Sequence, residues 1–159
     1  EDELALAYRD RTLHRNFMGY TTHKGLDIVA AGVSAIGTMN NTYTQVHKDE
    51  GLWREAIADG KPPWVRGMLL NEDDAVRREL IIQLSCNLET DLDALCDNGV
   101  TRFAPELDSL KPMFDDECIE LVGTRLIVTE RGRPFVRNLC AAFDRYLKRQ
   151  EKGSFSRTS

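Results

Sequence analysis

The chain of 159 residues has few cysteines and histidines, and none of them is arranged as a metal site usually is. Cys86, Cys96, Cys118 and Cys140 are scattered, without a Cys-x-x-Cys pair. Two disulfides are conceivable, but Cys86 and Cys140 fall on apolar helix faces, where a free thiol behaves as a small hydrophobic group. We therefore expect reduced thiols in a cytoplasmic protein. No histidine has a partner three or four residues away, so we expect no metal site.

The sequence also lacks a long apolar run and an excess of positive charge. No run approaches the roughly 20 residues that a membrane-spanning helix needs. The net charge of −5 gives no electrostatic reason to expect nucleic acid or an anionic membrane as a partner. The first residues, Glu1–Leu4, lack an initiating Met and resemble neither a signal peptide nor a transit peptide. We expect a globular chain that is processed or cut from something longer.

In the N-terminal part, the residue pattern predicts a helix, a loop and a buried strand. Residues Glu1–Tyr8 suit the end of a helix, and the polar segment Arg9–Gly25 has no helical or strand periodicity. Ile28–Ile36 is a short, nearly continuous apolar run, which is typical of a strand covered on both faces. A buried helix is the competing interpretation, although Gly32 disfavours it. Because few other segments could pair with such a strand, we expect the end of a larger, truncated fold.

The middle of the chain predicts a short helix, a linker and then a long helix. Lys48–Ala58 suits a helix that Gly60–Pro63 stops, and we expect a linker from there to Leu70. Asn71 precedes an acidic first turn and is therefore the expected N-cap of the next helix. Leucines then recur every four residues up to Leu92, which predicts a long amphipathic helix.

The C-terminal part predicts more helices and a hairpin. The long helix is expected to break near Asn87, and a second helix covers Phe103–Phe114. Gly123–Thr124 suits the type II′ turn of a hairpin between Ile119–Leu121 and Leu126–Val128, two segments rich in β-branched and aliphatic residues. Phe135–Leu147 has the clearest helical periodicity in the chain. Helices, a hairpin and a closing helix together predict a winged-helix-like domain.

Charge argues against DNA binding by this domain. On the expected recognition helix and its end, acidic side chains outnumber basic ones, so the surface would repel phosphates. The acidic residues are Glu106, Asp108, Asp115, Asp116 and Glu117, and the basic ones are Arg102 and Lys111. A winged-helix-like unit that docks on a protein partner stays open as an alternative.

The segment Leu13–His23 has an aromatic pair, a glycine and several hydroxyl and amide groups. A loop of this composition can stack against a flat ligand while its polar groups form hydrogen bonds with it. On composition alone, an ordinary turn with two half-buried aromatic side chains would be the favoured interpretation.

The order of residues in this segment is more informative than its composition. The run His-Arg-Asn-Phe-Met-Gly-Tyr-Thr-Thr, followed by Asp27 and by Gly32–Ile36, resembles the characteristic run of the oxygen-independent coproporphyrinogen III oxidases. The related haem chaperones typically have an Asn-Leu-x-Tyr-Trp pattern instead, so a chaperone-like relative is the alternative. Residues 93–118 match most loosely. The resemblance continues through Tyr43–Gln45, Arg66–Gly67, Asp73–Asp74, Arg77–Arg78, Cys86–Asn87, Val128–Thr129, Gly132–Arg133, Arg137–Asn138, Phe143–Asp144 and Phe155–Arg157.

The resemblance implies a radical S-adenosylmethionine enzyme with a [4Fe-4S] cluster. Such an enzyme oxidatively decarboxylates two propionates of coproporphyrinogen III to vinyl groups and gives protoporphyrinogen IX in haem biosynthesis. The family holds its cluster with a Cys-x3-Cys-x2-Cys loop, which this sequence lacks. We therefore expect the chain alone to be inactive, with no catalytic residue and no bound cofactor.

The resemblance also implies ligand contacts and a domain organisation. Ile36 matches a contact to S-adenosylmethionine, and Phe17 with Met18 matches a second position that contacts an adenosyl ligand. Some relatives have Gln in place of Met18, and a thioether cannot replace the hydrogen bonds of an amide.

The fold class expected is α+β and mainly helical. Residues 1–46 would be the end of a truncated radical-SAM α/β barrel, 47–70 a linker, 71–149 the winged-helix-like domain, and 150–159 a polar tail. The second domain would cover the barrel mouth and help to hold the tetrapyrrole. If the truncated barrel leaves a strand bare, we expect it to pair in a symmetric homodimer.

Overall fold

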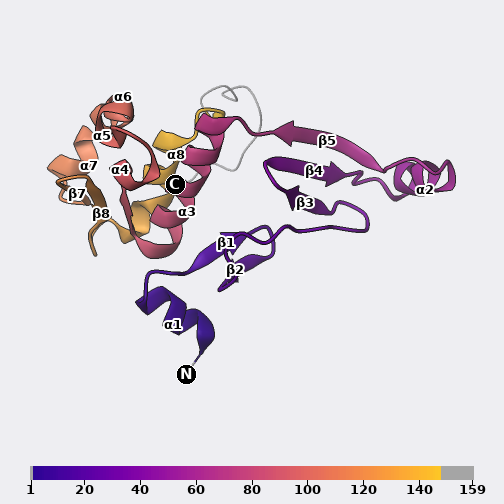
Figure 1. Cartoon of the computed structure of the whole chain (residues 1–159), viewed down its shortest axis with the longest axis horizontal. Helices are drawn as coiled ribbons and strands as arrows, with labels where there is room; N and C mark the ends of the chain where they lie inside the picture. Colours follow the sequence, from indigo (N-terminus) through magenta and orange to yellow (C-terminus); the bar gives the residue numbers. More distant parts are fainter. Residues whose placement is uncertain (1, 148–159) are drawn as a thin grey trace.

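The computed structural model describes residues 2–147, so the expected polar tail lies outside the described residues. Helices and strands are mixed along the chain, and the described residues form no closed barrel (Figure 1). The elements before residue 70 are α1 (Glu3–Arg9), β1 (His14–Asn16), β2 (Gly19–Thr21), β3 (Ile36–Met39), β4 (Thr42–Val46), α2 (Glu50–Ala58) and β5 (Trp64–Leu69). Those after it are α3 (Glu72–Asn87), β6 (Glu89–Asp91), α4 (Leu92–Leu95), α5 (Gly99–Arg102), α6 (Ala104–Ser109), α7 (Lys111–Asp115), β7 (Ile119–Val122), β8 (Arg125–Val128), the 3-10 turn η1 (Arg133–Phe135) and α8 (Val136–Phe143).

The N-terminal elements form two small antiparallel sheets. β1 and β2 make a hairpin, and β3, β4 and β5 make a three-stranded sheet with β4 in the middle. This sheet projects away from the helical domain and carries α2 at its far end (Figure 1). The helix expected at Lys48–Ala58 is confirmed as α2, whereas Trp64–Leu69, expected as part of a linker, forms a strand of this sheet. The division into domains stays a prediction.

The expected buried strand at Ile28–Ile36 is wrong. Ile28 forms a single β-bridge with Thr38, and the regular strand begins only at Ile36. Gly32 and Ser34 have φ values of +109° and +62°, which an extended strand cannot include. Val29 is 80% exposed, so the apolar run does not form a core.

The segment Arg9–Gly25, in which we expected no regular structure, contains the β1–β2 hairpin. Its turn is Phe17–Met18, and Gly19 follows with a φ of +125° that favours glycine. The expected N-terminal helix is confirmed as α1. The side chain of Asp2 caps it by accepting hydrogen bonds from the N–H groups of Leu4 and Ala5.

Helix α3 begins as the sequence predicts. Asn71 and Asp74 form a reciprocal capping box, with distances of 2.9 and 3.1 Å between side-chain oxygen and backbone nitrogen. The expected break at Asn87 is confirmed, because Leu88 adopts a left-handed conformation with φ +62°. The expected continuation to Leu92 is wrong, since the residues after the break form strand β6.

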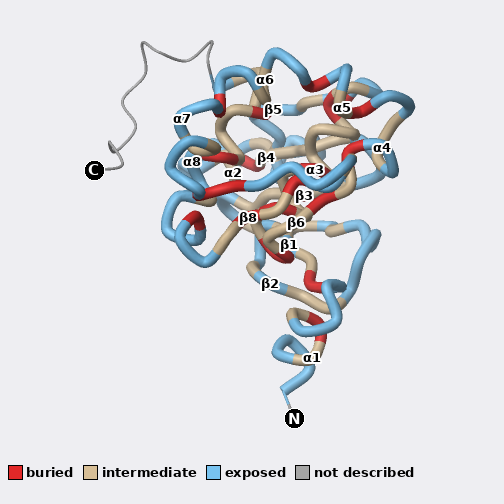
Figure 2. Tube along the Cα trace, turned by 90° about the vertical axis from the view of Figure 1, so that its left-hand side faces the viewer, coloured by how far each residue is buried: buried red, intermediate tan, exposed pale blue. Residues whose placement is uncertain are grey.

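The C-terminal domain contains the main core. Strands β6, β8 and β7 form an antiparallel sheet in that order, and the hairpin expected around Gly123–Thr124 is confirmed. The sheet and helices enclose apolar side chains, and the buried parts of the tube lie mainly in this domain (Figure 2), whereas most of β5 is exposed. The buried members are Leu80, Leu84, Leu92, Phe103, Leu110, Ile119, Leu126, Val128, Leu139 and Phe143.

Two helix predictions need correction. The single helix expected at Phe103–Phe114 is a series of shorter helices, because Pro105 and Pro112 sit in the first turns of α6 and α7. The last helix, α8, is shorter than expected, and Phe135 before it is about half exposed. The sequence of elements suits a winged-helix-like domain, which stays a prediction.

Candidate functional site

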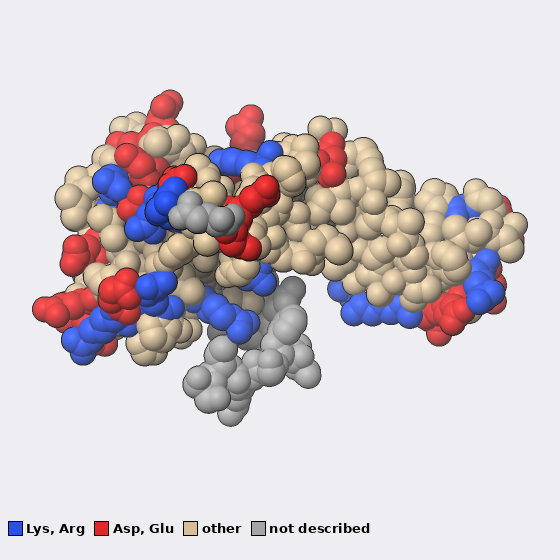
Figure 3. All heavy atoms as spheres, turned by 90° about the horizontal axis from the view of Figure 1, so that it is seen from below, with Lys and Arg blue, Asp and Glu red and all other residues tan. Residues whose placement is uncertain are grey.

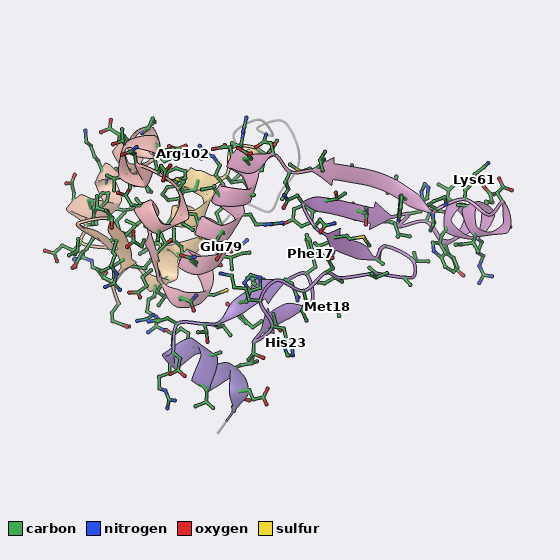
Figure 4. All side chains as sticks on the ribbon, in the orientation of Figure 1. Phe17, Met18, His23, Lys61, Glu79 and Arg102 are labelled. Carbon is green, nitrogen blue, oxygen red and sulfur yellow. The ribbon has the colours of Figure 1, made fainter. Side chains whose placement is uncertain are left out.

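The turn of the β1–β2 hairpin holds two of the predicted ligand contacts, Phe17 and Met18. The side-chain oxygen of Asn16 accepts a hydrogen bond from the N–H of Met18 at 2.8 Å, which fixes the turn. Met18 is 86% exposed, whereas Phe17 is 54% exposed. Figure 4 shows Phe17 between the hairpin and the β3–β5 sheet. The two neighbours therefore have different surroundings, and only the aromatic ring faces the sheet.

Phe17 contacts Tyr43 of β4 edge to face. Their ring centroids are 5.6 Å apart and the planes meet at 89°, a favourable geometry for two aromatic rings. Nothing in the local sequence of the hairpin specifies this contact, because Tyr43 comes from a different sheet. The contact brings the hairpin turn to the sheet that begins with Ile36.

Ile36 lies on the same face of that sheet as Tyr43. In the antiparallel pairing of β3 and β4, Ile36 is opposite Gln45 and Thr38 is opposite Tyr43. Paired residues point to the same side, and residues two apart on a strand share a face. Ile36, Thr38, Tyr43 and Gln45 therefore line the face that Phe17 meets. The structure thus brings Phe17 and Ile36 to one surface, with Met18 at its margin.

This surface can support one side of a flat ligand. It offers aromatic rings and an aliphatic side chain, together with the hydroxyl of Thr38 and the amide of Gln45. The sequence interpretation gave Tyr43 and Gln45 no role. The alternation of side chains along Thr42–Val46 is the signal that could have placed them on a common face.

The hairpin is held against helix α3 by polar contacts. Lys24, which follows β2, forms an ion pair with Glu79, with 2.5 Å between Nζ of Lys24 and Oε1 of Glu79. The side-chain amide of Gln83 donates a hydrogen bond to the same carboxylate at 2.9 Å. Burial alone would raise the pKa of Glu79, but these two partners outweigh it and the pKa lies below its ordinary value. Burial lowers the pKa of His14 in β1. At neutral pH the Glu79 carboxylate is therefore charged and paired with Lys24.

The similarity to known proteins covers nearly the whole chain. No protein-family model matches. Over 157 residues the chain is 36% identical to oxygen-independent coproporphyrinogen III oxidase of Salmonella typhimurium, covering 96% of the chain and 34% of that protein. It is 38% identical over 161 residues to the protein of the same name from Pseudomonas aeruginosa, covering 99% and 35%.

A solved structure is also similar to this chain. Coproporphyrinogen III oxidase from Escherichia coli, described as a radical SAM enzyme, matches with a TM-score of 0.87 and 35% identity, covering 92% of this chain and 35% of that one. The chain is similar to a C-terminal part of the oxygen-independent coproporphyrinogen III oxidases. The family resemblance expected from the sequence is confirmed. The chain spans about a third of the length of the curated oxidases that it matches.

The residues of this oxidase-like chain do not fit a [4Fe-4S] cluster. All four cysteines are free, and burial raises the pKa of the Cys140 thiol to about 11. Cluster ligands are thiolates, which a buried thiol with a raised pKa supplies less readily. Among residues 2–147, no group of three or more His, Cys, Asp or Glu side chains could hold a metal ion.

The residues fit an adenosyl group better. An adenine ring needs an apolar or aromatic surface and a few polar groups at its edge. Phe17 and Ile36 supply the first from two different sheets, and they would contact such a ring from one side only. Met18 is oriented away from the sheet and offers no strong hydrogen-bonding group.

Proposed function

We propose that this chain is the C-terminal part of an oxygen-independent coproporphyrinogen III oxidase. That enzyme oxidatively decarboxylates two propionates of coproporphyrinogen III to vinyl groups and gives protoporphyrinogen IX in haem biosynthesis. The observation that carries the proposal is the structural match to the Escherichia coli enzyme, with a TM-score of 0.87 at 35% identity over 92% of the chain.

In the full-length protein, S-adenosylmethionine and a [4Fe-4S] cluster would supply the radical chemistry. This chain would contribute binding residues and none of the cluster ligands. Phe17 and Ile36 would contact the adenosyl part of S-adenosylmethionine, with Tyr43 supporting the Phe17 ring from the side. Met18 matches the same site, but its exposed thioether would not replace an amide contact.

The C-terminal domain would form a winged-helix-like cover that helps to hold the tetrapyrrole. Its candidate recognition helices are acidic, which fits a role in covering a site better than a role in binding nucleic acid. No helix among the described residues is long and apolar enough to cross a membrane. We place the enzyme in the cytoplasm, in keeping with reduced thiols.

The proposal is tested with the protein that includes this chain and any residues encoded before it. Under anaerobic conditions, with S-adenosylmethionine and a reductant, we expect conversion of coproporphyrinogen III with release of carbon dioxide. Phe17→Ala should raise the KM for S-adenosylmethionine. The matched control is Phe135→Ala, which removes a half-exposed ring at the start of α8 in the C-terminal domain and should leave KM unchanged. No turnover by a cluster-containing protein would contradict the proposal.

A second experiment addresses the chain alone. After anaerobic iron–sulfur reconstitution it should stay colourless and should not cleave S-adenosylmethionine. The reason is the absence of a Cys-x3-Cys-x2-Cys loop from its sequence. A stoichiometric [4Fe-4S] absorbance would show that the scattered cysteines assemble a cluster, and the proposed division of roles would then be wrong.

A further inference from the structure

Two neighbouring residues of α3, Arg78 and Glu79, contact the two sheets that form the candidate site. Glu79 accepts a hydrogen bond from Lys24, just after the hairpin, at 2.5 Å. Arg78 donates to the side-chain oxygen of Asn41 at 3.4 Å, in the turn that joins β3 to β4. One turn of α3 therefore contacts both the hairpin that carries Phe17 and the sheet that it meets.

Further hydrogen bonds hold the side chain of Glu79 in place. Its carboxylate also accepts from Gln83, and the hydroxyl of Thr90 in β6 donates to Gln83 at 2.7 Å. The Glu79 side chain is 27% exposed, whereas that of Lys24 is 62% exposed. The helix and the C-terminal sheet thus orient Glu79, and Glu79 in turn orients the more exposed lysine.

The start of the hairpin is attached separately. The buried side chain of Asn87 donates to the carbonyl of Leu13 at 3.2 Å, and Arg11 donates to the carbonyl of Asn87. Glu79 and Asn87 are eight residues apart on α3, about 12 Å along the helix. The hairpin is therefore held at its entry by Asn87 and at its exit by Glu79. With only the entry contact, the hairpin could rotate about Leu13.

We propose that Glu79, acting through Lys24, is a positioning residue for the turn that carries Phe17. The inference rests on the proposed function of that turn in contacting S-adenosylmethionine. Without the ion pair, the hairpin exit is released and Phe17 leaves Tyr43 for part of the time. The adenosyl group then loses one of its two apolar contacts, while the C-terminal core is unchanged. Figure 4 shows Glu79 on the side of α3 that is nearer to the hairpin.

The test compares Glu79→Gln with a matched control. The pair of Glu89 and Arg125, at 2.9 Å and with a carboxylate exposure of 24%, lines the same hollow as Lys24 and Glu79. Neither residue forms a hydrogen bond or ion pair with the hairpin within the described part of the chain. Glu89→Gln is therefore the control. In this chain, the nuclear Overhauser contact between the rings of Phe17 and Tyr43 should weaken in Glu79→Gln and stay unchanged in Glu89→Gln. The charge swap Lys24→Glu with Glu79→Lys should restore it.

A second measurement gives the consequence for the ligand. In the full-length protein, the Kd for S-adenosylmethionine should rise about three-fold to five-fold in Glu79→Gln, the range expected for a partly exposed ion pair. The swap should recover most of the affinity. An unchanged ring contact in Glu79→Gln, an equal loss in the control, or no recovery in the swap would overturn the inference.

Different results would contradict the proposed binding site and the proposed positioning role of Glu79. If the unaltered full-length protein does not bind S-adenosylmethionine, the proposed function of the site is wrong. The ring contact then still decides whether Glu79 positions the hairpin, because it is measured without ligand.

Discussion

Phe143, the last residue of α8, meets Phe103 edge to face in the centre of the C-terminal core. The ring centroids are 5.7 Å apart, the planes meet at 84°, and both side chains are fully buried. Arg77 lies over the Phe103 ring and donates to the carbonyl of Phe143 at 3.1 Å. The closing helix is therefore joined to α3 and to the short helices by apolar and polar contacts at one place.

Truncating the buried side chains of α8 should destabilise the domain strongly. We expect Phe143→Ala and Leu139→Ala each to lower the free energy of unfolding by about 2–5 kcal/mol, because each leaves a cavity in a packed core. Phe135→Ala, just before α8, should change it by less than about 0.5 kcal/mol because the ring is half exposed. Urea denaturation measures all three. Midpoints within error of the unaltered chain would show that α8 is not packed as described.

Local signals in the sequence predicted some of the C-terminal elements. The N-cap at Asn71, the Gly123–Thr124 hairpin and the periodicity of α8 each depend on residues close together in the chain. Strand β6 was missed because its pairing with β8 is a contact between distant residues. The prediction of a strand at Ile28–Ile36 is wrong because it was based on local composition alone. The composition suits a strand, but only a single bridge to Thr38 pairs with this segment.

The candidate site was only partly predictable. Phe17, Met18 and Ile36 came from the family resemblance, and the structure places Phe17 and Ile36 on one surface. The alternation along Thr42–Val46 places Tyr43 on one face of β4 but does not mark it as the contact of Phe17, and no local feature marks Glu79. Their roles arise from contacts with Phe17 and Lys24, which only the tertiary structure brings into reach.

Gly132 should tolerate no side chain. A Cβ at this position would lie 1.9 Å from the carbonyl oxygen of Cys118, which is backbone and cannot move aside cheaply. We expect Gly132→Ala to lower the free energy of unfolding by about 1–3 kcal/mol or more. Gly67→Ala is the control, because its Cβ would meet only the carbonyl oxygen of Tyr43, at 3.8 Å. Equal stability of the two variants in thermal unfolding would contradict the close approach at Gly132.

The buried thiol of Cys140 should make the fold sensitive to alkaline pH. Burial raises its pKa from 9.0 to about 11, so the folded chain retains a proton that the unfolded chain loses in this window. The stabilising contribution is present below pH 9 and falls as the pH rises towards 11. Compared with the unaltered chain, Cys140→Ala should lose less stability between about pH 8 and about pH 10.5 in urea unfolding. Parallel losses in both proteins would show that this thiol ionises normally.

The edge strand β5 should make the isolated chain dimerise. The homodimer expected from the sequence was assigned to Ile28–Ile36, but the structure places an exposed strand at β5, which pairs within the described residues only with β4. Its side chains Val65 and Leu69 are exposed, and Arg66 is the one charged residue of the strand. Figure 3 shows the molecule from the side away from β5, where charged side chains are sparse between the helical domain and the end that carries α2. An uncovered apolar edge invites pairing with a second copy, most commonly by two-fold symmetry.

Sedimentation of the chain should therefore show a monomer–dimer equilibrium that shifts towards dimer as concentration rises. Val65→Lys with Leu69→Lys should shift it to monomer, because two buried lysines at a two-fold interface repel each other and cost desolvation energy. Leu52→Lys on α2, also at an exposed apolar position, should leave the equilibrium unchanged. A monomer at every concentration would rule out pairing through β5. A dimer that survives the double substitution would place the interface elsewhere on the chain.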